Sequence, residues 1–190
     1  MARTTKRETD PGTGAETSAT RTSEAAESAD PAADTRWLSR DELEAWLANS
    51  AIMISLPAAL DARMQREAAL TFFEYMVLSV LSEQPERTLR MSDLATRTSA
   101  SLSRLSHVVG RLEKRELVER ARVPGSGRRT VATLTETGYQ VVVAAAPGHV
   151  AAVREYLIDE IEPRDLAALR RIGAAVDAAI NRETRSPQQG

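Results

Sequence analysis

Cysteine is absent from the 190-residue sequence, and this absence excludes disulfide bonds, thiol-based redox sensing and cysteine nucleophiles. Histidine is scarce as well: His107 and His149 are the only two, and neither belongs to a cluster with the spacing of a metal site. Aromatic residues make up only 4% of the sequence, so a hydrophobic core is expected to be mostly aliphatic. Gly125-Ser126-Gly127 lies between two expected strands and opens no helix, unlike a phosphate-binding loop. We therefore expect no enzymatic activity, no metal and no cofactor.

Long unbroken apolar runs are also missing. None approaches the roughly 20 residues that are needed to cross a bilayer. The N-terminal region lacks the apolar core of a secretion signal. We therefore expect a cytoplasmic protein with no membrane partner.

Charge is distributed unevenly along the chain, although the formal net charge is only −2. Residues 87–130 contain eleven arginine and lysine residues and four acidic residues, a surplus of seven positive charges. Residues 1–34 contain four basic and seven acidic residues, a surplus of three negative charges. A basic segment inside an otherwise acidic protein is the electrostatic pattern of a nucleic-acid-binding module.

The segment SLSRLSHVVGRLEK, residues 101–114, has the period of an amphipathic helix. Its apolar face carries Leu102, Leu105, Val109 and Leu112, with Val108 beside them. The opposite face combines small polar side chains with cations and has no carboxylate before Glu113; its members are Ser103, Arg104, Ser106, His107, Gly110 and Arg111. A merely solvated face usually mixes both signs of charge, whereas an acid-free face that donates hydrogen bonds suits the phosphates and base edges of a DNA groove.

The residues before this helix predict a helix-turn-helix. Residues 91–98 form a short helix with Ser92 as its expected N-cap and Leu94 facing inward. The triplet Ser99-Ala100-Ser101 then forms a tight turn, in which Ser101 caps the second helix. Two short helices joined by so tight a turn are typical of DNA-binding proteins.

The residues after it predict a β-hairpin. Residues 117–123 and 128–134 alternate in side-chain character on either side of the turn Pro124-Gly125-Ser126-Gly127. A helix-turn-helix followed by such a hairpin is a winged helix. The expected fold class is therefore mainly α with a small β-hairpin wing, flanked by N- and C-terminal helices.

These flanking helices carry apolar stripes with little to pack against locally. Residues 39–42 and 71–74 have the pattern of capping boxes that start two of the helices. Pro57 is expected to kink or split the first helix, and Pro147-Gly148 to interrupt the helix that starts at residue 135. The last helix carries one aliphatic seam at spacings of three and four, formed by Leu166, Leu169, Ile172, Val176 and Ile180. Stripes at both ends of a basic middle favour a twofold homodimer with intertwined terminal helices.

The chain accordingly divides into five expected segments. Residues 1–34 have no large apolar side chain after the initial methionine and predict a disordered tail. The others are a dimerisation helix over 35–68, a winged helix-turn-helix DNA-binding domain over 69–135, C-terminal dimerisation helices over 136–182 and a frayed end over 183–190.

Four stretches in this order resemble the MarR-type (multiple-antibiotic-resistance) transcriptional regulators: LRMSDLATRT, RLEKRELVER, the arginine-containing hairpin with its glycines, and LTETGYQVV. The resemblance extends over about residues 37–181 and implies a homodimer on double-stranded DNA. It also implies that the second helix enters the major groove and that the wing reaches the minor groove. Two positions depart from the family: Glu116 stands where glycine is usual, and Ser126 where an acidic wing residue is usual. A non-glycine residue at the first position costs about 1 kcal/mol if its backbone is left-handed.

The residues and the resemblance together assign the expected DNA contacts. These are Ser101, Ser103, Arg104, Ser106, His107 and Arg111 on the helix, and Arg128 and Arg129 on the wing. The family implies repression from a pseudo-palindromic operator. It also implies control by a small molecule bound in a cleft between the dimerisation helices and the winged helix. Aromatic composition alone makes four residues candidates for this cleft: Trp46, Phe72, Phe73 and Tyr75.

Two other classes of protein contain a winged helix. One is a protein-interaction module that does not bind DNA; the acid-free helix face disfavours it, and a salt-dependent DNA shift would exclude it. The other is a methyltransferase with a winged-helix dimerisation region, for which no segment remains to build a cofactor domain.

Overall fold

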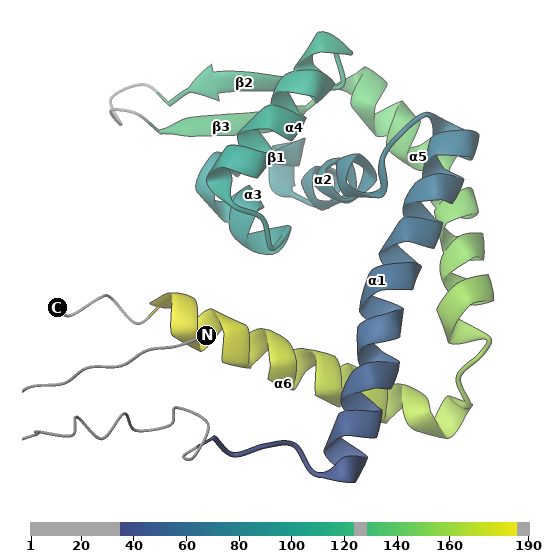
Figure 1. Cartoon of the computed structure of the whole chain (residues 1–190). Coiled ribbons are helices and arrows are strands. Elements are labelled where there is room, and N and C mark those ends of the chain that lie inside the picture. The colour runs from purple at the N-terminus through teal and green to yellow at the C-terminus, as the bar shows by residue number, and fades with distance from the viewer. Residues whose placement is uncertain (1–34, 124–128, 186–190) are drawn as a thin grey trace, which may run out of the picture. The chain divides into compact units, whose positions relative to one another are not determined.

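The computed structural model describes residues 35–123 and 129–185. The chain divides into two units between Ser39 and Arg40, and the helices and strands of the described residues all lie in the second unit (Figure 1). In chain order they are α1 (Arg40–Ala68), α2 (Phe72–Ser82), β1 (Thr88–Arg90), α3 (Met91–Arg97), α4 (Leu102–Lys114), β2 (Val118–Arg122), β3 (Thr130–Leu134), α5 (Glu136–Val153) and α6 (Leu166–Arg185). Short 3-10 turns at Pro85–Arg87 and Pro163–Asp165 precede β1 and α6, and a π-helical turn at Arg154–Ile158 extends α5. The fold is mainly α with a small antiparallel sheet, as predicted.

The sheet has three strands in the order β1-β3-β2, one more than the predicted hairpin. In the register, Ala132 of β3 lies opposite Leu89 of β1 and Arg120 of β2. The hydroxyls of Thr88 and Thr133 are 2.8 Å apart across the β1–β3 pair. Sequence periodicity did not predict β1 because three residues are too few to display an alternation.

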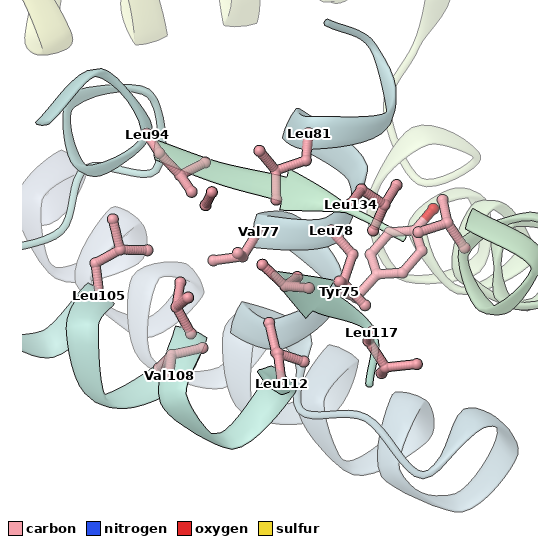
Figure 2. Close-up of a cluster of buried hydrophobic side chains, with 14 of the residues drawn as sticks. Tyr75, Val77, Leu78, Leu81, Leu94, Leu105, Val108, Leu112, Leu117 and Leu134 are labelled. Atoms are coloured by element: carbon pink, nitrogen blue, oxygen red, sulfur yellow. The ribbon is translucent and has the colours of Figure 1, made fainter. Parts of the chain in front are cut away.

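The helix α2 starts with a complete capping box and runs into the core. The Glu74 carboxylate accepts the Thr71 N–H at 2.9 Å, and the Thr71 hydroxyl accepts the Glu74 N–H at 3.1 Å. The α2 side chains Val77, Leu78 and Leu81 are fully buried. Figure 2 shows them together with aliphatic side chains of α3, α4 and the strands, so α2 lies at the centre of the winged helix.

The helix α4 begins where the sequence predicts, because the Ser101 hydroxyl accepts the Arg104 N–H at 3.2 Å. Its buried side chains are Leu105, Val108, Val109 and Leu112. Leu102, expected on the same face, is instead 56% exposed. The reason is its place in the first turn of α4, where it lines a hollow between α3, α4 and the sheet rather than joining the core.

The start of α3 corrects a second expectation. The N-cap position is Arg90, which provides no side-chain cap, because β1 runs directly into α3. Ser92, expected as the N-cap, lies inside the helix, and its hydroxyl donates to the carboxylate of Asp93 at 3.1 Å. Leu94 is fully buried, as predicted.

Both helices of the helix-turn-helix end on a left-handed residue other than glycine. Ser99 follows α3 with φ 50°, and Glu116 follows α4 with φ 59°. After α4, the Leu117 N–H donates to the Leu112 carbonyl at 3.0 Å, and the Glu116 N–H donates to the Glu113 carbonyl at 2.9 Å. This is a Schellman motif, whose left-handed position favours glycine. The departure from glycine at Glu116 therefore strains the backbone.

The prolines of the outer helices end neither helix. The helix α1 continues through Pro57, so of the predicted kink or split the split does not occur, and α5 continues through Pro147, so the predicted interruption of α5 is wrong. The two helices pack side by side (Figure 1). Arg63 of α1 adds an ion pair to Glu155 and lies 5.9 Å from the centre of the Tyr156 ring.

Large apolar side chains of the outer helices remain exposed. On α1 they include Leu43, Trp46, Leu47, Ile52, Met53 and Ile54, and the predicted seam of α6 is exposed throughout. By length and composition alone, α1 and the stretch Glu136–Ile158 are each apolar enough to cross a membrane, with a mean hydropathy of 1.3 over 18 residues. Scattered polar residues interrupt both stretches, so neither contains an unbroken apolar run long enough to cross a membrane.

Replacing the strained residue after α4 with the residue that its backbone favours is expected to stabilise the fold. Glu116→Gly should raise the free energy of unfolding by up to about 1 kcal/mol and the melting temperature by roughly 2–4 °C. The matched control is Glu119→Gly at an exposed position of β2, where glycine should destabilise the strand. Thermal unfolding followed by circular dichroism measures both. A lower melting temperature for Glu116→Gly would contradict the strain.

Candidate nucleic-acid interface

The residues expected to contact DNA from α4 are all exposed. They are Ser101, Ser103, Arg104, Ser106, His107 and Arg111. On the wing, Arg129 is exposed directly before β3, and its carbonyl accepts the Val123 N–H at 3.0 Å at the base of the hairpin. Arg128 lies outside the described residues. The fold thus buries one face of α4 in the core and leaves the cationic face uncovered beside the hairpin (Figure 1).

A hollow of about 500 Å³ lies between α4 and the sheet, and its lining is strongly basic. The side chains around it are Arg90, Met91, Ser92, Leu102, Ser106, Arg120, Arg129 and Thr130. Three guanidinium groups and three hydroxyls at one concave surface can donate several hydrogen bonds to a phosphate. Among these residues, Arg90, Ser92 and Arg120 were not predicted as site residues. Arg90 and Arg120 come to lie near Arg129 because β1 and β2 both pair with β3.

Arg120 of β2 also braces the recognition helix α4. Its backbone N–H donates to the Glu113 carboxylate at 3.2 Å, and its guanidinium pairs with the same carboxylate. A further hydrogen bond of 3.4 Å runs from Arg120 to the Ser106 hydroxyl. Glu113 is the first carboxylate along α4, so this pairing offsets its negative charge at the edge of the exposed face.

A second hollow, of about 370 Å³, separates α4 from the start of α2. Its lining includes three of the expected DNA contacts, Arg104, His107 and Arg111. The guanidinium carbon of Arg104 lies 4.3 Å from the centre of the Phe73 ring, a cation–π contact. Phe73 therefore packs against the cationic face of α4, and it stays a candidate for the effector pocket by composition alone.

Glu74 is the one buried carboxylate among the described residues, with 5% of the residue exposed. Arg111 donates from Nε to this carboxylate at 3.1 Å, and Arg115 lies 3.9 Å from its other oxygen. Burial by itself would raise the pKa of Glu74, but the hydrogen bonds from Thr71 and Arg111 outweigh it and hold the pKa below its ordinary value. The sequence identified Glu74 only as a capping residue, because its contact with Arg111 joins residues 37 positions apart.

The four effector-pocket candidates do not gather in one place within the described residues. Phe72 and Tyr75 both lie against His149 of α5, with ring centres 5.8 Å and 4.6 Å from the imidazole. Phe73 faces Arg104 instead, and Trp46 is 54% exposed on α1. The small-molecule cleft thus stays a prediction.

His149 lies where α2 and α5 meet, and its Nδ1 atom is buried. Among the described residues, no hydrogen-bond partner meets this nitrogen. Burial lowers the pKa of His149, because the charged imidazolium loses its water there. The neutral imidazole is therefore the form that the fold prefers.

Comparisons with known proteins point to one family. A sequence model of the MarR family matches residues 70–129. The structure is similar to that of Sco3205, a MarR family transcriptional regulator from Streptomyces coelicolor solved in complex with DNA, with 38% identity, a TM-score of 0.73 and coverage of 76% of this chain and 94% of that one. It is similarly close to AbsC, a MarR family transcriptional regulator from the same organism, with 37% identity, a TM-score of 0.73 and coverage of 77% and 99%. PcaV from S. coelicolor, solved with its natural ligand, shares the fold at 21% identity, a TM-score of 0.63 and coverage of 77% and 99%. No functionally curated protein matches the chain.

Folding stability is expected to fall as His149 becomes protonated. Its pKa is lower in the folded chain than in the unfolded chain, so between the two values the unfolded chain binds more protons and acid favours unfolding. His149→Phe should weaken the loss of stability as the pH falls below 6.5, the ordinary pKa of histidine. Chemical denaturation at several pH values measures this dependence, with His107→Gln on the exposed face of α4 as the control. An unchanged pH dependence in His149→Phe would exclude the buried imidazole as its source.

Proposed function

The chain belongs to the MarR family of transcriptional regulators, and from this premise we propose that it is a repressor that binds a pseudo-palindromic DNA operator as a homodimer. The observation that carries the proposal is the division of α4 into two faces. Leu105, Val109 and Leu112 are wholly buried on one face, while Arg104 and Arg111 are exposed on the other. A helix held by its apolar face and uncovered on its cationic face is suited to a DNA groove.

In this proposal α4 enters the major groove. Ser103, Arg104, Ser106 and His107 contact bases and phosphates there, while Ser101 and Arg111 contact the phosphate backbone. The solved complex of Sco3205 with DNA supports DNA binding by similarity. The basic hollow beside α4 offers further donors for a phosphate between the recognition helix and the wing.

The wing reaches the minor groove through Arg128 and Arg129. Minor-groove arginines respond to the enhanced negative potential of a narrow groove more than to individual bases. Arg129 lines the basic hollow together with Arg120, which connects the wing to the recognition helix. The two elements therefore present one continuous basic surface.

A second copy of the chain covers the exposed apolar faces of the outer helices. None of the α6 residues whose side chains are described is buried, although Leu169, Ile172 and Val176 form a regular apolar seam. Association with an identical copy removes such seams from water, and twofold symmetry places two winged helices on two operator half-sites. This accounts for the apolar character of α1 and α5 without a membrane.

A small molecule controls the affinity for DNA in this proposal. Ligand-bound relatives such as PcaV support it by similarity of fold alone. The candidate cleft residues remain Trp46, Phe72, Phe73 and Tyr75. Phe72 and Tyr75 have the strongest support, because their rings meet His149 at the junction of α2 and α5.

The groove assignment predicts different effects for two arginines. Arg104→Ala should cost about 1–3 kcal/mol at particular base pairs and relax specificity there, if it contacts a base edge. Arg128→Ala should weaken binding to all sites and lower the salt slope by about one unit per lost phosphate-like contact. Titration of both variants against single-base changes in a selected operator, at several salt concentrations, separates the two effects. Base-specific relaxation from Arg128→Ala alone would overturn the assignment, and the absence of salt-dependent binding would favour the protein-interaction module.

The dimer depends on the α6 seam in this proposal. Ile172→Asp places a charge within the seam, where burial without a partner costs several kcal/mol, so we expect monomers or insoluble protein. Ala174→Asp, on the opposite face of α6, should leave the dimer intact. Sedimentation equilibrium measures both masses. A soluble Ile172→Asp dimer with wild-type melting behaviour would show that the seam is not the interface.

A further inference from the structure

The first turn of α2 contacts three other helices through consecutive residues. Phe72 donates its N–H to Asp61 of α1 at 2.8 Å, and its ring lies against His149 of α5. The next two residues, Phe73 and Glu74, point to the recognition helix instead. The first turn of α2 therefore has one side that packs against α1 and α5. Its other side contacts Arg104 and Arg111, two of the expected DNA contacts.

Phe73 provides a platform for Arg104. The guanidinium carbon lies 4.3 Å from the ring centre, well within the range of a cation–π interaction. An exposed arginine samples many rotamers, and stacking on a ring restricts it to a few of them. A cation–π contact uses none of the guanidinium N–H groups as hydrogen-bond donors to an acceptor atom, so these groups can donate to DNA.

Glu74 provides a fixed anchor for Arg111. Its carboxylate is buried and held by the capping box, so it moves little relative to α2. Of the N–H groups of Arg111, the Nε–H is the one that donates to this carboxylate, at 3.1 Å. Among the described residues, no hydrogen-bond partner meets the two Nη groups of Arg111, which remain free to donate to a phosphate.

We propose that Phe73 and Glu74 are positioning residues for DNA binding, which hold the Arg104 and Arg111 side chains in the conformations that contact DNA. This inference rests on the proposed function, because it presumes that both arginines contact DNA. It adds two residues outside the recognition helix and the wing to the determinants of affinity.

The expected effect follows from pre-organisation. Immobilising one long side chain on binding costs about 0.5–1.5 kcal/mol, so an arginine that is already held should bind roughly two- to tenfold more tightly. Replacing Phe73 or Glu74 should therefore weaken DNA binding only while the arginine that it holds is present. An effect of Phe73 or Glu74 on DNA affinity that acts through the overall fold, and not through the arginine side chain, would persist when that arginine is alanine.

Two double-mutant cycles test the proposal. One combines Phe73→Leu with Arg104→Ala, and the other combines Glu74→Gln with Arg111→Ala. Glutamine keeps an oxygen that can accept the Thr71 N–H of the capping box, so Glu74→Gln removes mainly the charge towards Arg111. The probe is a labelled duplex selected from a random pool by the wild-type protein, titrated at several salt concentrations. Circular dichroism confirms that each variant is folded at the assay temperature.

Each holding variant is expected to weaken binding two- to tenfold alone and to have no further effect when its arginine is already alanine. Phe73→Tyr, which keeps the ring, should retain wild-type affinity. The matched control is Phe72→Leu: its ring contacts His149, so its effect should add to that of Arg104→Ala.

Additive effects in both cycles, or wild-type affinity of both holding variants, would overturn the positioning role and leave the proposed function intact. Wild-type affinity and salt slope of Arg104→Ala and Arg111→Ala would instead show that these arginines do not contact DNA. That result would refute the proposed contacts and the positioning role together.

Discussion

Three side chains of the recognition helix, Leu105, Val109 and Leu112, are removed completely from water within the core around α2, and every functional feature of the winged helix depends on this burial. Full burial of one aliphatic side chain contributes about 1.5–3 kcal/mol, so the inner face of α4 supplies a large share of a marginal stability. The Ser101 cap and the turn at Glu116 confine the helix to the length that this face supports. Because the buried face of α4 provides the stabilising contacts, its exposed face can carry cations.

A buried carboxylate connects that core to the cationic face. Desolvation penalises the charge of Glu74, and such a group persists in a fold only when hydrogen bonds and counter-charges compensate it. Thr71 supplies the hydrogen bonds of the capping box, and Arg111 supplies the counter-charge from the recognition helix. The same carboxylate thus starts α2 and contacts an arginine on the exposed face of α4, so helix capping and arginine placement cannot vary independently.

Local patterns in the sequence predict the local features of this fold. The predicted capping box at Thr71 and the predicted cap at Ser101 are correct, because each depends on residues within a few positions of one another. The incorrect or missing predictions concern features that depend on contacts between separate helices and strands. A strand as short as β1 has no period, and its presence moves the start of α3 away from Ser92. The exposure of Leu102 and the anchors of Arg104 and Arg111 depend on where separate elements meet, which periodicity does not contain.

The described chain has two kinds of apolar surface, and they serve different ends. The core around α2 is closed within one chain, whereas α1, α5 and α6 leave aliphatic side chains exposed that only another surface can cover. The two kinds meet at the first turn of α2, where Asp61 of α1 accepts the Phe72 N–H and His149 of α5 lies against the Phe72 ring. Phe73 and Glu74, the next residues in that turn, contact the recognition helix. One helical turn of α2 therefore connects the packing of α1 and α5 with the cationic face of α4.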